Sequence, residues 1–211
     1  MKEQNTRKHT SSITNNMEFN IPSWNQIYSL LLELAEAVRK SRFKPEVIVG
    51  VSRGGWIPAR IMSDLLENPK LVNVAIEYYV GIAETKHEPM LTQPVSLPVK
   101  DKKVLVLDDV ADTGESLKLV KAHIKKQGAS EIRIATIYYK PRSVTVPYYY
   151  RKKTSSWIIF PWDRKEAAKK VVEKFRANGR TKKDAKEKLI SSGLNRELVE
   201  RFIKEAAEEE T

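Results

Sequence analysis

The stretch that most constrains the fold of this chain is residues 104–116, which read VLVLDDVADTGES. Four apolar residues come first, followed by the adjacent carboxylates Asp108 and Asp109 and then by a third carboxylate, Asp112. A short apolar run that ends in acids and leads into a helical pattern is typical of a buried strand in an α/β sheet. We therefore predict a strand, a tight loop and a helix to Gln127, with a ligand site at the carboxyl end of the strand.

The loop after the acids is suited to binding a phosphate. The first N–H groups of a helix have no partner within the helix, and the helix dipole adds partial positive charge there. Thr113, Gly114 and Ser116 add small hydroxyls and an unobstructed backbone, so a phosphate can bind among them. The neighbouring carboxylates suit sugar hydroxyls and magnesium, which prefers oxygen ligands. The residues predict a sugar-phosphate site, and the alternative is a solvated acidic turn with an ordinary helix cap.

Composition and motif content exclude several classes of protein. The chain has no cysteine, so disulfides and thiolate zinc sites are excluded. It contains neither the G-x-x-x-x-G-K-[ST] nor the G-x-G-x-x-G nucleotide-binding motif. No apolar run reaches the length of a membrane span and no signal peptide is recognisable, so we expect a cytoplasmic protein without a membrane partner. The net charge is +11, but the basic residues are spread through the chain and mixed with acidic ones. This distribution favours a solvated surface and an anionic substrate over nucleic acid as a partner.

Other segments have simpler patterns. Residues 1–20 are polar and are predicted to be disordered. Ser23 can cap a packing helix over residues 24–41, where apolar residues recur at helical spacing. Further strands are expected at residues 47–51, 71–79 and 131–139.

A second anion site is predicted where the first of these strands ends. The turn Ser52-Arg53-Gly54-Gly55 leads into a helix that runs to Leu66 and carries a proline in its first turn, where no N–H is missed. Arg53 thus lies at a strand end beside a helix N-terminus. The alternative is a plain turn with a surface arginine.

Residues 104–116 resemble the phosphoribosyl-pyrophosphate signature of the type I phosphoribosyltransferases. The resemblance implies an α/β fold with a mainly parallel sheet flanked by helices, together with a small hood. It implies that the 5′-phosphate of phosphoribosyl pyrophosphate binds to the loop Asp112, Thr113, Gly114, Glu115 and Ser116. Glu115 departs from the family, whose members commonly carry Gly or Lys there. We expect its side chain to face solvent, because a carboxylate beside a phosphate is repulsive.

The same resemblance assigns two further loops. Ser52, Arg53 and Gly54 match the family's pyrophosphate loop, and a cis peptide is expected between Ser52 and Arg53. Residues 80–98 lack a clean period, and the family has a mobile flap at this point that closes over the sugar. The alternative is an ordinary surface loop.

Lys140-Pro141 after a strand, followed by Trp157-Ile158 and Pro161-Trp162-Asp163, resembles the xanthine-guanine branch of the 6-oxopurine enzymes. The resemblance implies that Lys140 donates to the purine O6, that Trp157 stacks on the base and that the Ile158 carbonyl accepts from the ring edge. The alternatives are a surface lysine and a core tryptophan.

The resemblance also implies a reaction and its partners. Asp112 would be the general base at purine N7, and Asp108 and Asp109 would hold the ribose hydroxyls as the other catalytic carboxylates. Magnesium would be held by Asp109 and Asp108, with Asp163 near a second metal position. The substrates would be phosphoribosyl pyrophosphate and a purine base, and a homodimer or homotetramer is expected. The alternative function is a phosphoribosyl-pyrophosphate-sensing regulator that binds nucleic acid through its basic surface or helical tail.

We predict three regions along the chain: the polar segment 1–20, a phosphoribosyltransferase domain at 21–163, and a helical extension at 164–211. Within the domain, residues 80–98 form the flexible loop, and the base-binding hood spans 140–163.

Overall fold

The computed structural model describes residues 17–68, 70–80 and 87–208. The chain divides into two compact units. One unit is Ile27–Ser155, and the other combines the segments Met1–Gln26 and Ser156–Thr211.

A six-stranded sheet with the order β4-β3-β2-β5-β6-β7 organises the unit Ile27–Ser155. Its strands are β2 (Val47–Ser52), β3 (Leu71–Val80), β4 (His87–Gln93), β5 (Lys103–Ala111), β6 (Glu131–Tyr139) and β7 (Tyr149–Lys153). Every neighbouring pair is parallel except β3 and β4. The carboxyl ends of β2, β5 and β6 therefore meet at one edge of the sheet. The predicted mainly parallel sheet flanked by helices is confirmed.

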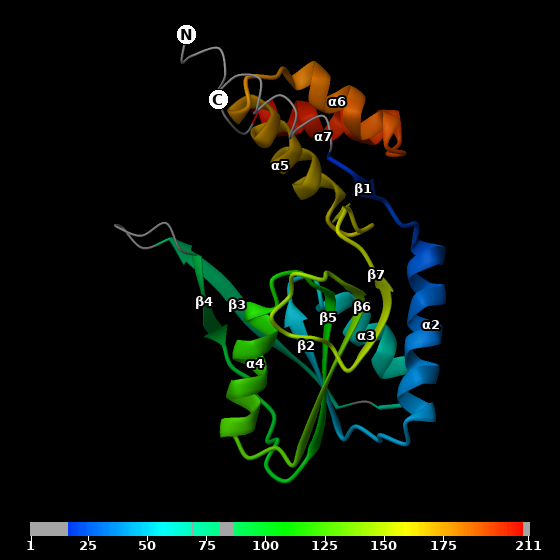
Figure 1. The fold of residues 1–211 in the computed structure, drawn as a ribbon, viewed down its shortest axis with the longest axis vertical. Helices are drawn as coiled ribbons and strands as arrows, with labels where there is room; N and C mark the ends of the chain where they lie inside the picture. Colours follow the sequence, from blue (N-terminus) through cyan, green and yellow to red (C-terminus); the bar gives the residue numbers. More distant parts are fainter. Residues whose placement is uncertain (1–16, 69, 81–86, 209–211) are drawn as a thin grey trace. The chain divides into compact units, whose positions relative to one another are not determined.

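Helices cover both faces of this sheet. They are α2 (Trp24–Lys40), α3 (Trp56–Leu65) and α4 (Glu115–Lys126), with α4 on one side and α2 and α3 on the other (Figure 1). Leu117, Val120 and Ile124 of α4 pack against the valines of β2 and β5. Alternate residues of a strand point to opposite faces, so an uninterrupted apolar run such as that of β5 is buried by helices on both sides.

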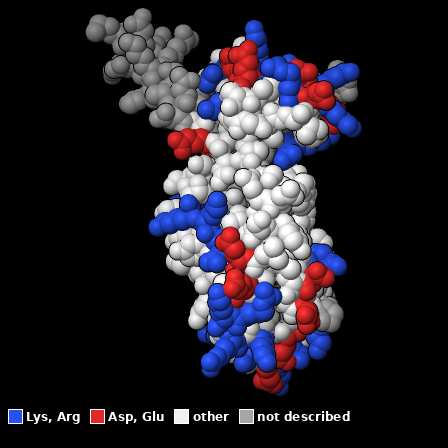
Figure 2. Space-filling view, turned by 90° about the vertical axis from the view of Figure 1, so that its right-hand side faces the viewer, with Lys and Arg blue, Asp and Glu red and all other residues white. Residues whose placement is uncertain are grey.

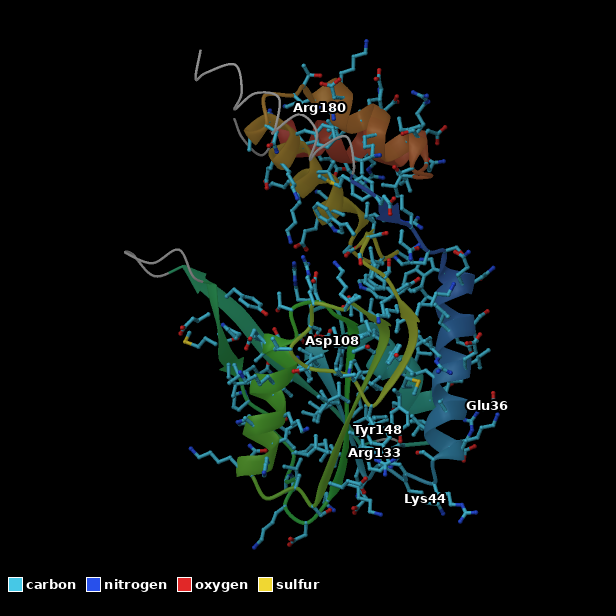
Figure 3. The ribbon with its side chains drawn as sticks, viewed as in Figure 1. Glu36, Lys44, Asp108, Arg133, Tyr148 and Arg180 are labelled. Carbon is cyan, nitrogen blue, oxygen red and sulfur yellow. The ribbon has the colours of Figure 1, made fainter. Side chains whose placement is uncertain are left out.

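The amino end of the sheet is fixed by Arg133 of β6. Its guanidinium carbon lies 4.5 Å from the ring centroid of Phe43 and 4.4 Å from that of Tyr148. Its Nη1 donates to the Tyr149 hydroxyl at 2.7 Å. Figure 3 shows Arg133 and Tyr148 at one end of this unit and Asp108 nearer the other. These contacts therefore hold the sheet at the end away from the acids of β5.

The second unit contains the short parallel pair β1 (Phe19–Asn20) and β8 (Trp157–Ile158) and three further helices. The helices are α5 (Arg164–Ala177), α6 (Lys182–Ser191) and α7 (Arg196–Glu208), as predicted for the C-terminal extension. Thr181 and Asp184 form a capping box at the start of α6. The helices share a small apolar core that includes Val171, Phe175 and Leu189.

Two predictions for irregular segments need correction. The disorder predicted for residues 1–20 does not hold at Phe19–Asn20, because these residues pair with β8, and residues 1–16 lie outside the described residues. The loop predicted for residues 80–98 is wrong at His87–Gln93, which form β4. This edge strand is defined by its backbone pairing with β3. An edge strand tolerates a proline and does not require alternating apolar residues, so the sequence pattern did not indicate it. Residues 81–86 of the expected flap lie outside the described residues.

Charged residues are interspersed on the surface. Figure 2 shows basic and acidic side chains together on one face. In the helical unit, Lys165 pairs with Glu205 at 2.8 Å and Lys186 with Glu200 at 2.7 Å. Among the described helices, none combines the length and the apolar character needed to cross a membrane.

Candidate active site

The predicted phosphate loop joins β5 to α4 through a left-handed glycine. Gly114 has φ +81° and immediately precedes α4. A Cβ at this position would lie only 2.6 Å from the backbone nitrogen of Thr145. Both the dihedral angle and the close approach therefore require glycine. This conformation brings the chain directly into the first turn of α4, where the N–H groups have no helical partner.

The segment 143–145 braces this loop from behind. The Val144 N–H donates to the Thr113 carbonyl at 2.8 Å, and the Thr145 hydroxyl donates to the Gly114 carbonyl at 2.9 Å. These bonds occupy the loop's carbonyl oxygens rather than its N–H groups. The brace was not predicted from the sequence, because its partners are about thirty residues apart and local patterns do not report such contacts.

The predicted pyrophosphate loop lies directly against the acids of β5. The peptide bond between Ser52 and Arg53 is cis, which confirms the expectation. A Cβ on Gly54 would come within 2.6 Å of the Asp109 carboxyl carbon, and a Cβ on Gly55 within 2.8 Å of the Asp108 Cα. The two glycines thus allow close contact between the loop and β5. The structure brings the basic loop and the acid pair together at one sheet edge.

Asp108 and Asp109 differ in environment although they are adjacent. Burial raises the pKa of Asp108 well above its ordinary value of 3.8, and the neighbouring Asp109 carboxylate raises it further. The Asp109 N–H donates to Asp108 Oδ1 at 2.9 Å and offsets part of this effect. Such a pair gains from a nearby cation or from hydroxyl donors. The substrates predicted from the sequence would supply both.

Asp112 lies between two cations. Lys140 Nζ donates to its Oδ2 at 2.9 Å, and Arg142 Nε donates to its Oδ1 at 2.8 Å. The Lys140 side chain is only 8% exposed, whereas that of Arg142 is 66% exposed. Burial raises the pKa of Asp112, but the hydrogen bonds from Lys140 and Arg142 lower it by more, so this pKa lies below its ordinary 3.8. The predicted general base and the predicted base-binding lysine are thus brought together. Arg142 was not predicted.

The lowered pKa of Asp112 predicts a pH-dependent contribution to stability. A carboxyl group whose pKa is lower in the folded than in the unfolded chain stabilises the fold above its unfolded pKa, near 3.8, and this contribution is lost as pH falls below it. At pH 7 we expect the free energy of unfolding of the wild type to be about 1 kcal/mol higher than that of Asp112→Asn, because the partly exposed ion pairs of Asp112 with Lys140 and Arg142 are lost in the variant. The difference should shrink below pH 3.8 in denaturant titrations. A constant difference down to pH 3 would contradict the ion pairing.

Two side chains near the phosphate loop complete its surroundings. Glu115 lies 3.8 Å from Lys118 Nζ on the next helical turn, and its carboxylate side chain is 42% exposed. The Ser116 hydroxyl forms a 2.6 Å hydrogen bond with the hydroxyl of Tyr78, near the end of β3. Tyr78 was not assigned a role from the sequence.

The remaining predicted site residues belong to the other unit. Trp157 lies in β8, where its ring centroid is 5.8 Å from that of Phe19. Ile158 is buried, and Asp163 precedes α5. The base-binding roles of Trp157 and Ile158 and the metal-binding role of Asp163 stay predictions.

Metal binding by the protein alone is not indicated for the described part of the chain. Among residues 17–68, 70–80 and 87–208, no group of three or more His, Cys, Asp or Glu side chains could hold a metal ion. Magnesium, however, usually keeps several waters and binds through one or two carboxylates together with substrate phosphates. The pair Asp108 and Asp109 fits that mode of binding.

The chain is similar to known proteins over most of its length. Residues 20–169 match the family described as "Phosphoribosyl transferase domain". The xanthine-guanine phosphoribosyltransferase of Gluconobacter oxydans is 27% identical over 143 residues, covering 67% of this chain and 82% of the relative. That of Idiomarina loihiensis is 29% identical over 151 residues, covering 70% and 88%.

The solved structures give the same result. The crystal structure of a purine phosphoribosyltransferase from Pyrococcus horikoshii is 40% identical, with a TM-score of 0.63, over 69% of this chain and 94% of that one. The matched family, this level of identity and the arrangement of the two loops around the β5 acids agree. The chain therefore belongs to the phosphoribosyl transferase domain family.

Proposed function

We propose that this protein is a purine salvage enzyme that transfers the 5-phosphoribosyl group of phosphoribosyl pyrophosphate to a 6-oxopurine. The products are the nucleoside 5′-monophosphate and pyrophosphate. The observation that best supports this proposal is the 2.9 Å hydrogen bond from Lys140 Nζ to Asp112 Oδ2 beside the phosphate loop. N7 and O6 lie on the same edge of a 6-oxopurine, so a proton acceptor next to a cationic donor matches that edge.

Different residues at this edge of the sheet bind different parts of phosphoribosyl pyrophosphate. The phosphate loop from Asp112 to Ser116 binds the 5′-phosphate through its N–H groups and hydroxyls. Arg53 and the amides of its loop stabilise negative charge on the departing pyrophosphate. Asp108 and Asp109 hold the ribose hydroxyls, and their negative field favours the cation-like state at the anomeric carbon.

Magnesium carried by phosphoribosyl pyrophosphate would be held by Asp108 and Asp109, with Asp163 near a second position. When bound, the ion supplies charge neutralisation on the pyrophosphate oxygens.

The base is recognised and deprotonated at the other end of the loop. Lys140 leaves Asp112 and donates to the purine O6. The freed Asp112 carboxylate takes the N7 proton of the N7–H tautomer as N9 bonds to the anomeric carbon and the bond from that carbon to pyrophosphate breaks. Arg142 keeps a hydrogen bond to the other oxygen of Asp112, so the carboxylate stays oriented while Lys140 moves. We further propose that Trp157 stacks on the base and that the Ile158 carbonyl accepts from its ring edge.

One assay tests the proposed function. Purified protein is incubated with magnesium, phosphoribosyl pyrophosphate and guanine, hypoxanthine, xanthine or adenine, and nucleotide formation is followed by chromatography. We expect nucleotide from at least one 6-oxopurine and little from adenine, because its amino group cannot accept from Lys140. Binding of phosphoribosyl pyrophosphate without product from any base would overturn the enzymatic proposal.

Lys140→Ala tests the recognition of O6. Loss of a charge-assisted hydrogen bond should raise KM for the 6-oxopurine about 10- to 100-fold. KM for phosphoribosyl pyrophosphate should stay within about twofold, because the backbone of the phosphate loop is braced by other residues. Lys152→Ala, which removes an exposed lysine of β7, is the matched control. An equal rise in both KM values would place Lys140 outside base recognition.

A further inference from the structure

The hydrogen bond between Tyr78 and Ser116 links two segments that are distant in the sequence. Tyr78 is on β3 and Ser116 is in the first turn of α4, 38 residues later, and their hydroxyl oxygens are 2.6 Å apart. This separation is normal for an O–H···O bond. Tyr78 is 47% exposed, so burial does not by itself dictate where its hydroxyl lies.

The position of Ser116 makes this contact relevant to ligand binding. The carbonyl side of the phosphate loop is braced by Val144 and Thr145. On the N–H side, Glu115 N–H makes a long hydrogen bond of 3.5 Å to Thr113 Oγ1. Ser116 carries one of the two hydroxyls of the loop. A serine hydroxyl has a single proton and rotates freely, so it can donate to only one acceptor at a time. Whether that proton is directed to a phosphate depends on what else bonds to the oxygen.

We propose that Tyr78 is a positioning residue for the 5′-phosphate, an inference that rests on the proposed function. The phenol O–H is more acidic than an aliphatic hydroxyl and donates to Ser116 Oγ. Ser116 then directs its own proton to a phosphate oxygen. Consecutive hydrogen bonds of this kind polarise one another and strengthen the final one. Tyr78 thus acts on phosphate affinity through Ser116 and does not take part in base recognition.

A double-mutant cycle tests this proposal. The proteins are wild type, Tyr78→Phe, Ser116→Ala and the double variant, with Tyr28→Phe as control because Tyr28 is also 47% exposed. We expect Tyr78→Phe to raise KM for phosphoribosyl pyrophosphate about fivefold, the effect of one neutral hydrogen bond. KM for the base, kcat and the melting temperature should not change. In the Ser116→Ala background, Tyr78→Phe should have no further effect, because the residue through which it acts is gone.

Binding of ribose 5-phosphate, measured by calorimetry on the same proteins, separates this proposal from the proposed function. The same non-additive pattern in its Kd supports the role of Tyr78 even if no base is converted to nucleotide. Normal catalysis with an unchanged KM in Tyr78→Phe overturns the role of Tyr78 and leaves the function intact. Additive effects of the two substitutions, or equal effects on both substrates, also overturn it. Absence of ribose 5-phosphate binding to the wild type overturns the role of Tyr78 and Ser116 in phosphate binding, while nucleotide formation in the base assay decides the proposed function separately.

Discussion

Asp112→Asn is expected to lower kcat by about 10²- to 10⁴-fold, the usual contribution of a general base. Asparagine keeps the size of the side chain but cannot take a proton from the purine. It also leaves Lys140, whose side chain is only 8% exposed, without a carboxylate partner. Steady-state kinetics with the preferred 6-oxopurine measures the effect. Affinity for phosphoribosyl pyrophosphate, measured by calorimetry, should change little because the amides of the loop are retained.

Asp64→Asn is the matched control, since Asp64 is an exposed acid on α3. It should leave kcat and both KM values unchanged. Retained turnover in Asp112→Asn would remove Asp112 from the chemistry. A variant that also fails to bind phosphoribosyl pyrophosphate would show a structural role of Asp112 in the loop.

Gly114→Ala is expected to raise KM for phosphoribosyl pyrophosphate about 100-fold, because misplacement of binding groups by about 1 Å can cost that much. Two effects combine at this position. The left-handed backbone conformation costs a non-glycine residue about 1–2 kcal/mol. The added Cβ would also meet the backbone nitrogen of Thr145 at 2.6 Å. Backbone cannot move aside as a flexible side chain can, so the phosphate loop itself must shift.

Gly179→Ala separates these two effects. Gly179 has a similar φ of +70°, but a Cβ there would have nothing within 4 Å. This control should lose only the backbone contribution to stability, about 1–2 kcal/mol, with unchanged kinetics. If Gly114→Ala kept its affinity for phosphoribosyl pyrophosphate, the loop would be shown to tolerate displacement. Its assignment as the phosphate site would then be wrong.

The sequence predicted best those elements whose patterns are local. The β5 run and its acids predict a strand and loop because apolar residues end where carboxylates begin. Helix α6 was predictable because Thr181 and Asp184 form a capping box within four residues. In contrast, β7 was not predicted. Of its five residues only Tyr149 is buried, so its existence depends on backbone pairing with β6.

The predicted site was incomplete for a similar reason. Asp112, Ser116 and the Ser52–Arg53 turn stand in recognisable motifs. Arg142 and Tyr78 do not. Arg142 contacts Asp112, 30 residues away in the sequence, and Tyr78 contacts Ser116, 38 residues away. A lone arginine or tyrosine with no nearby pattern gives no signal of such a contact. Contacts of this kind depend on strand order, which no local pattern encodes.

The short segment 140–145 performs two tasks at once. Lys140 and Arg142 hold Asp112, while Val144 and Thr145 hold the backbone of the phosphate loop. Under the proposed function, phosphoribosyl pyrophosphate bound at this loop would contact the same segment that positions Lys140 and Arg142, which predicts sequential addition with the pentose donor first. Within the segment, the two tasks fall on different residues. Lys140 bonds to the Asp112 side chain, so its substitution can change nucleobase preference alone, whereas substitutions at Val144 or Thr145 that shift the segment's backbone will disturb donor affinity.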